Sequence, residues 1–218
     1  MDLAPLLDEL PPERRLALAY APGPARADIL AVLLLDLRLS RLIGQGREPL
    51  LTQLRLAWWR DRLGEAPSGF HHDEPVLALL ASWGERRAAL VALVDGWEAL
   101  LAEPPIPDAA INAFADGRGA AFAALAEQLG AGLSAAAAGR FGRNWALADL
   151  AAKTSDADEA ARVRAIATGQ DWSPAKLPRA LRPLTVLHGL ARRKQGAGPL
   201  LGSFADTICA MRLGLFGR

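Results

Sequence analysis

The sequence has one cysteine, Cys209, among its 218 residues. A single cysteine forms no internal disulfide, which excludes the small secreted scaffolds that disulfides hold together. Cys209 lies between Ile208 and Ala210. An apolar setting of this kind favours a small packed side chain over a catalytic thiol.

Long hydrophobic runs are also missing. The longest, residues 29–35, covers seven positions, whereas roughly 20 are needed to span a bilayer. Residues 1–10 carry three acidic side chains and lack the basic start and apolar core of a secretory signal. We therefore expect a cytoplasmic protein, with peripheral attachment at the inner membrane as the alternative.

Neither sign of charge is in large excess, because 25 basic residues face 24 acidic ones and the net charge is +1. Such a balance does not predict a polyanion-binding surface, and no nucleic-acid-binding module is recognisable, so nucleic acid is not an expected partner. The C-terminal third is locally basic, which suits anionic lipid head groups or an acidic protein partner but also a solvated helix end. Its cations are Arg179, Arg182, Arg192, Arg193 and Lys194.

Strand signals are nearly absent as well. No run alternates β-branched and polar residues, whereas apolar side chains recur at helical spacing through most of the chain. These patterns predict one all-α domain over residues 1–218. The expected helices cover residues 14–20, 25–43, 48–63, 74–81, 83–102, 107–129, 134–153, 156–168, 174–194 and 200–215.

The helix expected at 25–43 is apolar on most sides and contains Asp36. A charge buried without a partner is costly, so Asp36 is expected to meet a cation, a metal or several hydrogen-bond donors, unless it lies solvated at the helix rim. Arg55 or Arg60 of the following antiparallel helix could reach it, since the guanidinium fork pairs well with a carboxylate.

Several segments resemble the squalene/phytoene synthase family. The most specific is RLAWWRD at residues 55–61 with its Arg47-Glu48-Pro49 lead-in, and weaker matches lie at 16–22, 93–98 and 177–184. More narrowly, the sequence looks like a bacterial branch related to the mitochondrial complex I assembly factor of that superfamily. The resemblance implies an isoprenoid-synthase-type helical bundle around a central cavity.

In active members of that family, two Asp-rich motifs on facing helices hold Mg²⁺, which neutralises the diphosphate of a prenyl substrate. This sequence departs from both motifs. The first is reduced to Asp36, with Ser40, Arg41 and Gly44 at or near the acidic positions, and the second to Asp149. Asn144 and Lys153 flank Asp149 where the resemblance implies further acids.

These departures predict a family member with no catalytic residue, no metal ligand and no cofactor. Its expected role is assembly or scaffolding, which by resemblance concerns respiratory complex I. Two alternatives stay open. One is an active prenyl-diphosphate transferase that binds Mg²⁺ through atypical ligands such as Asp36, Asp61 and Asp149. The other is a metal-free carrier of prenyl diphosphate or prenyl lipid.

The helix expected at 48–63 supplies the candidate cavity or anion-binding residues, which are Arg55, Trp58, Trp59, Arg60 and Asp61. Neighbouring side chains on a helix point about 100° apart, so only one tryptophan of the pair is expected to lie fully in a single interface. The other is expected to face a second helix, a partner or a lipid surface. Partners therefore remain a protein or a membrane surface.

Two further groups of residues have structural interpretations. His71, His72 and Asp73 lie in an expected loop and lack a third ligand at helical spacing, so a solvated loop is preferred over a metal site. Residues 117–119, Gly-Arg-Gly, do not form a phosphate loop, and the two glycines are expected to permit close helix packing.

Overall fold

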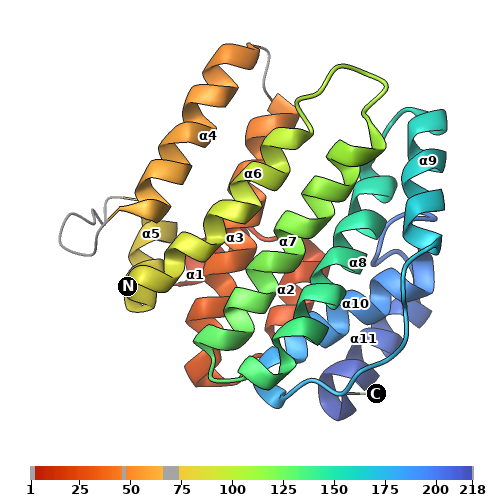
Figure 1. The fold of residues 1–218 in the computed structure, drawn as a ribbon. Helices are drawn as coiled ribbons and strands as arrows, with labels where there is room; N and C mark the ends of the chain where they lie inside the picture. Colours follow the sequence, from red (N-terminus) through yellow and green to blue (C-terminus); the bar gives the residue numbers. More distant parts are fainter. Residues whose placement is uncertain (1–2, 46–47, 66–73, 218) are drawn as a thin grey trace.

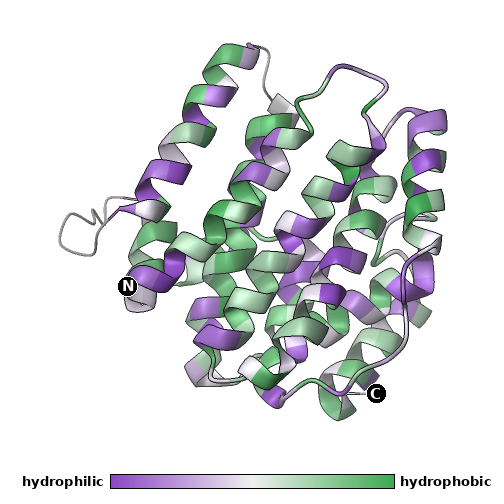
Figure 2. Ribbon diagram, in the orientation of Figure 1, coloured by the Kyte–Doolittle hydropathy of each residue, from purple (hydrophilic) through white to green (hydrophobic). Residues whose placement is uncertain are grey.

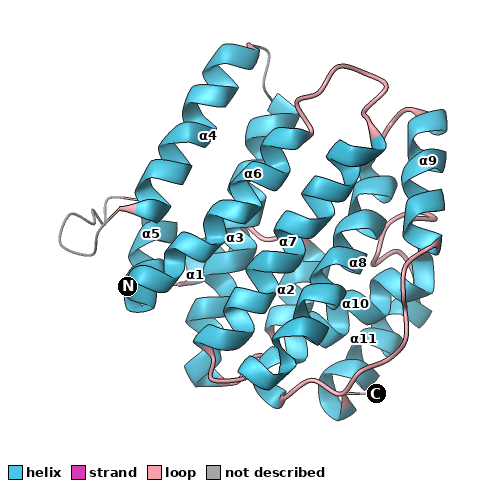
Figure 3. Cartoon of the chain, in the orientation of Figure 1, coloured by secondary structure: helices cyan, strands magenta, loops and turns pink. Residues whose placement is uncertain are grey.

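The computed structural model describes residues 3–45, 48–65 and 74–217. All regular secondary structure in these ranges is helical, as Figure 3 shows, which confirms the predicted all-α fold. The α-helices are α1 (Ala4–Asp8), α2 (Pro12–Leu18), α3 (Gly23–Gln45), α4 (Pro49–Gly64), α5 (Pro75–Leu80), α6 (Val91–Ala99), α7 (Asp108–Gln128), α8 (Ala135–Lys153), α9 (Ala157–Thr168), α10 (Arg182–Lys194) and α11 (Phe204–Phe216). Short 3-10 helices are η2 (Ala81–Leu90), η3 (Gly132–Ser134) and η4 (Arg179–Leu181).

Helices α6, α7 and α8 form the middle of the bundle, where α7 packs extensively against both neighbours (Figure 1). Helix α3 crosses against α5, α6 and α7, while α10 packs on α8 and α2, and α11 packs on α10. Helix α4 lies at one edge, against α6 and η2. Hydrophobic and hydrophilic bands alternate along α4 and α6 (Figure 2), as expected for helices that bury part of their surface.

Local sequence signals explain where several helices begin. Proline occupies the first turn of α2, α4 and α5, where its missing N–H costs no hydrogen bond. The side chain of Asp156 accepts a hydrogen bond from the Glu159 amide at 2.8 Å and caps α9. Ser203 and Asp206 form a reciprocal capping box at the start of α11.

Close packing of α6 on α7 depends on Gly117. A Cβ atom at this position would lie 2.3 Å from the Ala92 carbonyl oxygen, a contact that no side chain can make without moving the backbone. A Cβ atom at Gly119 would likewise lie 2.8 Å from the Gly139 carbonyl oxygen of α8. The predicted packing role of the two glycines is therefore confirmed.

The structure differs from several of the predicted helices. The segment 83–102 is not one α-helix, because Gly84 has a left-handed backbone (φ 55°) and the 3-10 helix η2 precedes α6. Residues 174–178 are not helical, since proline at 174 and 178 cannot donate to a helix and disfavours helical geometry in the preceding residue. The short helix α1 was not predicted.

Among the described residues, no helix is long and apolar enough to cross a membrane. The predicted loop residues His71, His72 and Asp73 lie outside the described ranges.

Candidate functional site

The centre of the bundle holds a cluster of charged side chains from four helices. Asp36 comes from α3 and Asp149 from α8, the two helices on which the resemblance places the family's acidic motifs. Arg14 of α2 and Arg118 of α7 reach between them. All four side chains are buried. We call these four residues the central ion cluster.

Arg118 bridges the two aspartates. Its Nε and Nη2 donate to the two carboxylate oxygens of Asp36, each at 3.0 Å, and its Nη1 donates to Asp149 Oδ2 at 3.1 Å. A bidentate pair of this kind is among the stronger charge-assisted hydrogen bonds. Arg118 of α7 therefore joins α3 to α8 through their aspartates.

Arg14 supplies the second cation. Its Nη1 lies 2.8 Å from Asp36 Oδ2 and also donates to the Leu33 carbonyl at 3.2 Å, and its Nη2 lies 3.6 Å from Asp149 Oδ2. The Trp97 indole N–H adds a hydrogen bond to Asp36 Oδ1 at 2.9 Å. Each Asp36 oxygen thus accepts from at least two groups.

Aromatic rings enclose the two guanidinium groups. The Arg118 guanidinium lies over the rings of Trp145 and Phe114, with 4.4 Å and 4.8 Å to their centroids. Arg14 lies over Trp145 at 5.0 Å. Ring faces attract cations, and this attraction helps to offset the loss of hydration, since Arg14 Nε and Nη2 make no hydrogen bond to the described protein groups.

The electrostatics of the cluster favour the charged forms of Asp149 and Arg14. Burial by itself would raise the pKa of Asp149, but attraction to Lys153, Arg118 and Arg14 outweighs burial and holds that pKa far below its ordinary value. Burial lowers the pKa of Arg14, whereas Asp36 and Asp149 raise it, with a net increase. Asp149 and Arg14 are therefore ionised at neutral pH.

A magnesium-diphosphate site does not fit these residues. Mg²⁺ needs free carboxylate oxygens in octahedral geometry, but both Asp36 oxygens and Asp149 Oδ2 face guanidinium groups. Asp149 Oδ1 lies 2.9 Å from Lys153 Nζ. No group of three or more His, Cys, Asp or Glu side chains in the described ranges is arranged to hold a metal ion. A cation added here would be repelled by the arginines.

The other residues of the first degenerate motif, Ser40, Arg41 and Gly44, form no hydrogen bond or ion pair with Asp36. Ser40 donates to the Leu37 carbonyl of its own helix at 2.9 Å. Arg41 pairs with Glu9 at 2.8 Å, and Gly44 is exposed near the end of α3. None of the three contributes a hydrogen bond or ion pair to the central ion cluster.

In the second motif, Lys153 joins the cluster through its pair with Asp149. Asn144 is buried and donates from Nδ2 to the Asp171 carbonyl at 2.8 Å. Asn144 therefore tethers the segment after α9 to α8 and does not contact Asp36.

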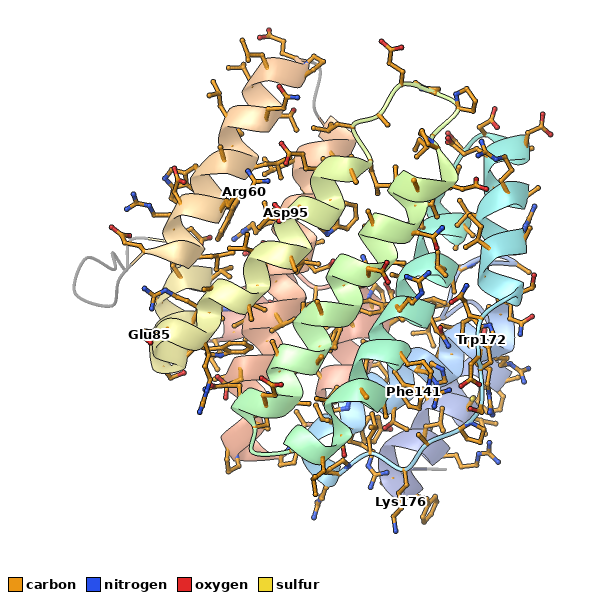
Figure 4. The ribbon with its side chains drawn as sticks, in the orientation of Figure 1. Arg60, Glu85, Asp95, Phe141, Trp172 and Lys176 are labelled. Atoms are coloured by element: carbon orange, nitrogen blue, oxygen red, sulfur yellow. The ribbon has the colours of Figure 1, made fainter. Side chains whose placement is uncertain are left out.

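The predicted pairing of Asp36 with Arg55 or Arg60 is wrong. Arg60 instead lies 2.6 Å from Asp95 and 2.5 Å from Glu98 on α6, as Figure 4 shows for Arg60 and Asp95. Arg55 is exposed on α4. Helix α4 lies at the edge of the bundle, so its arginines are remote from Asp36. Arg14 and Arg118 pair with Asp36 instead.

The tryptophan pair of α4 divides as expected. Trp59 is buried with 5% exposure, while Trp58 is 44% exposed and their rings meet edge to face. Asp61 is also exposed. Cavity or anion binding by Arg55, Trp58, Trp59, Arg60 and Asp61 remains a prediction, and Leu50, Leu51 and Leu54 extend the exposed apolar surface beside Trp58.

Sequence reasoning missed Arg14 and Arg118, the residues that organise the site. Arg118 did carry a signal, because it is the one charged residue in the Ala-, Gly- and Phe-rich stretch 117–126. That composition predicts burial of much of this stretch, although Ala120 is exposed, and a buried cation there requires an acidic partner. Arg14 follows Glu13 near the start of a short helix and offers no such signal.

The fold and the cluster define an all-α bundle whose two acidic helices are joined through arginine. Residues 12–110, a little less than half of the chain, match the family model described as squalene/phytoene synthase. The matched range includes Arg14 and Asp36 and ends before Arg118 and Asp149. No curated protein and no solved structure matches the chain significantly.

Proposed function

We propose that this protein is a non-catalytic member of the squalene/phytoene synthase family with a scaffold role. The observation that carries the proposal is the pairing of Asp36 and Asp149 with Arg118 and Arg14. In an active member, carboxylates at these helices would recruit Mg²⁺. Here the same carboxylates bind arginines of the same chain, which converts a metal-ligand position into a structural one.

A buried ion cluster of this kind favours a fixed arrangement of helices. Separating Asp36 from its arginines to admit a metal would leave guanidinium groups buried without partners, at a cost of several kcal/mol. The cluster also occupies the space between α3, α7 and α8 with side chains. Both points argue against a diphosphate-metal complex at the bundle centre.

The finer part of the proposal is assembly of respiratory complex I. It rests on the resemblance of residues 55–61 and 177–184 to the branch related to the complex I assembly factor. The exposed apolar residues of α4, among them Leu54 and Trp58, are compatible with a protein partner.

Calorimetric titration with farnesyl diphosphate, with and without Mg²⁺, tests the absence of catalysis. An active synthase serves as the positive control, and product analysis follows each titration. We expect no Mg²⁺-dependent binding and no hydrocarbon product. Mg²⁺-dependent binding with turnover would establish the active transferase and overturn the proposal. Binding that is independent of Mg²⁺, gives no product and is unaffected by Arg182→Gln would favour the carrier alternative.

A gene deletion in the native host tests the assembly role separately. We expect the amount of assembled complex I, measured by NADH dehydrogenase staining of native gels, to fall severalfold and to recover with a wild-type copy. Unchanged complex I would refute the assembly role while leaving the non-catalytic assignment intact, because the two tests measure different properties.

A further inference from the structure

Two adjacent hollows lie near the C-terminus of the chain and share no lining residue with the central ion cluster. The hollows, of about 450 Å³ and 270 Å³, lie where the segment 174–177 passes over α10 and the end of α11. They share Pro174, Ala175 and Gly217 as lining residues. Together they reach the size of ordinary small-molecule pockets. We call them the C-terminal cleft; Figure 4 labels Lys176, which lines the larger hollow, and Phe141, which lines the smaller one.

One face of α10 runs along the cleft. Arg182, Thr185, Gly189 and Arg192 follow at spacings of three, four and three residues, so their side chains lie in one row. Gly189 lies in the middle of this row and lets the Leu213 side chain pack directly on α10, because a Cβ atom at Gly189 would lie 2.1 Å from Leu213 Cδ1. Phe141 and Leu213 supply apolar lining to the smaller hollow.

Thr185 is the observation that favours a polar ligand in the cleft. Its side chain is 94% buried, since its exposure is 6%, and it lines the smaller hollow. Its hydroxyl has no hydrogen-bond partner among the described protein groups. Buried hydroxyls are normally hydrogen-bonded, so an oxygen of a bound molecule would complete this site.

Cations line the cleft without acidic partners. Lys176 and Arg182 line the larger hollow and Arg192 the smaller, and none forms an ion pair with a described residue. The neighbouring Arg193 and Lys194 differ, because both pair with Asp206. Gly217 lets the Arg182 guanidinium pack against the backbone at the cleft floor. Three cations without an acidic partner among the described residues therefore line the cleft.

Phe216 lies at the rim of the larger hollow and is exposed. On the same helix, Phe204, Ile208, Met211 and Leu215 form an exposed apolar row. The cleft thus combines unpaired cations, a buried hydroxyl donor and apolar walls beside an apolar surface. A purely polar anion would leave the apolar walls unused, and an uncharged hydrocarbon would leave the cations unused.

We propose that the C-terminal cleft binds an amphiphile with an anionic phosphate or carboxylate head group. The head group lies against Lys176, Arg182 and the Thr185 hydroxyl, where guanidinium and hydroxyl donors suit its oxygens. The apolar chain lies in the smaller hollow, against Phe141 and Leu213. This site is separate from the proposed scaffold function and from the central ion cluster, so neither depends on the other.

Calorimetry with monomeric dodecyl phosphate tests the proposal on the full chain. We expect micromolar binding, at least tenfold weaker for Arg182→Gln and for Lys176→Gln. Thr185→Val is expected to weaken binding severalfold without lowering the melting temperature, because the hydroxyl makes no hydrogen bond within the protein. Arg179→Gln is the matched control, since Arg179 is an exposed cation of the same region that does not line either hollow. It should bind within twofold of wild type.

Inorganic phosphate and dodecyl maltoside separate the two halves of the amphiphile. Equal binding of inorganic phosphate would overturn the chain-binding part, and equal binding of dodecyl maltoside would overturn the head-group part. The proposal as a whole would be overturned if dodecyl phosphate did not bind. It would also be overturned if Arg179→Gln lost as much affinity for dodecyl phosphate as Arg182→Gln. Ala175→Leu narrows both hollows without changing charge and should also weaken binding.

Vesicles of phosphatidylglycerol distinguish the source of the amphiphile. Co-sedimentation with these vesicles that Arg182→Gln reduces would support a membrane lipid as the ligand. Binding of monomeric dodecyl phosphate without co-sedimentation would support a free amphiphile. Co-sedimentation unaffected by Arg182→Gln, combined with no monomer binding, would overturn the site.

Discussion

Replacing Asp36 by alanine is expected to destabilise the fold strongly. The substitution removes three guanidinium contacts at 2.8–3.0 Å and the hydrogen bond from the Trp97 indole, all of them buried. Arg14 and Arg118 would then share Asp149, which Lys153 already contacts. Breaking a buried pair by removing one partner costs about 3–5 kcal/mol. For a chain of this length each kcal/mol lowers the melting temperature by about 2–4 °C.

Thermal unfolding followed by circular dichroism measures this effect, and a loss of about 8–16 °C is expected from a cost of about 4 kcal/mol. Asp61→Ala is the control, because Asp61 is exposed and has no ion pair in the described structure. It should change stability by less than about 0.5 kcal/mol. A loss of under about 3 °C for Asp36→Ala would refute the reasoning that the cluster carries stability.

A double variant separates charge burial from packing. Asp36→Leu with Arg118→Met removes a carboxylate and a guanidinium together and fills much of their volume with apolar atoms. Hydrophobic replacement of a buried ion pair is often neutral or stabilising. The double variant is therefore expected to be more stable than Asp36→Ala. A double variant that is less stable than the single one would show that Arg118 contributes mainly through other contacts.

The remaining predictions concern packing and pH. Gly117→Ala should cost about 1–3 kcal/mol or more in urea unfolding, because its Cβ would meet the Ala92 carbonyl oxygen at 2.3 Å; an unchanged urea midpoint would contradict the close helix approach. Trp59→Ala should cost about 3–5 kcal/mol, whereas Trp58→Ala should cost under about 1 kcal/mol, since only Trp59 is buried; equal losses would be inconsistent with this placement. Burial, with the charges of Arg192 and Arg140, lowers the pKa of His188 to about 3 against the partial opposition of Asp171. Unfolded histidine titrates near 6.5, so unfolding takes up a proton between pH 6.5 and 3, and stability should fall on acidification by about 1 kcal/mol per pH unit from this group. His188→Phe should reduce that slope in pH-dependent melting, and an identical slope would exclude His188 as its source.

Several properties of the two acidic motifs were predictable from the sequence. The loss of paired carboxylates was evident from Ser40, Arg41 and Lys153 alone, because residue identity fixes the charge. The need of Asp36 for a partner also followed from the apolar character of its helix. The i, i+4 spacing of Asp149 and Lys153 matches the ion pair that the structure contains.

The identity of the partner could not be obtained in that way. Arg55 and Arg60 were expected because they lie on the next helix of the chain, but α4 packs at the edge and Arg60 pairs with α6. Arg118 lies 82 positions from Asp36 along the sequence. A pairing over that distance depends on how α7 crosses α3, which local patterns do not specify.

The sequence by itself determined the helical class, most helix positions and the absence of acid pairs, and it left Asp36 either paired or solvated at the helix rim. These properties depend on composition and on periodicity within single helices. Tertiary structure alone decided that Arg14 and Arg118 bind both aspartates. It also decided that α4 lies at the edge of the bundle, and that α10, α11 and the segment 174–177 line a cleft with unpaired cations. Those features arise where helices distant in the chain meet, and their free energies depend on burial and distance, which no segment encodes on its own.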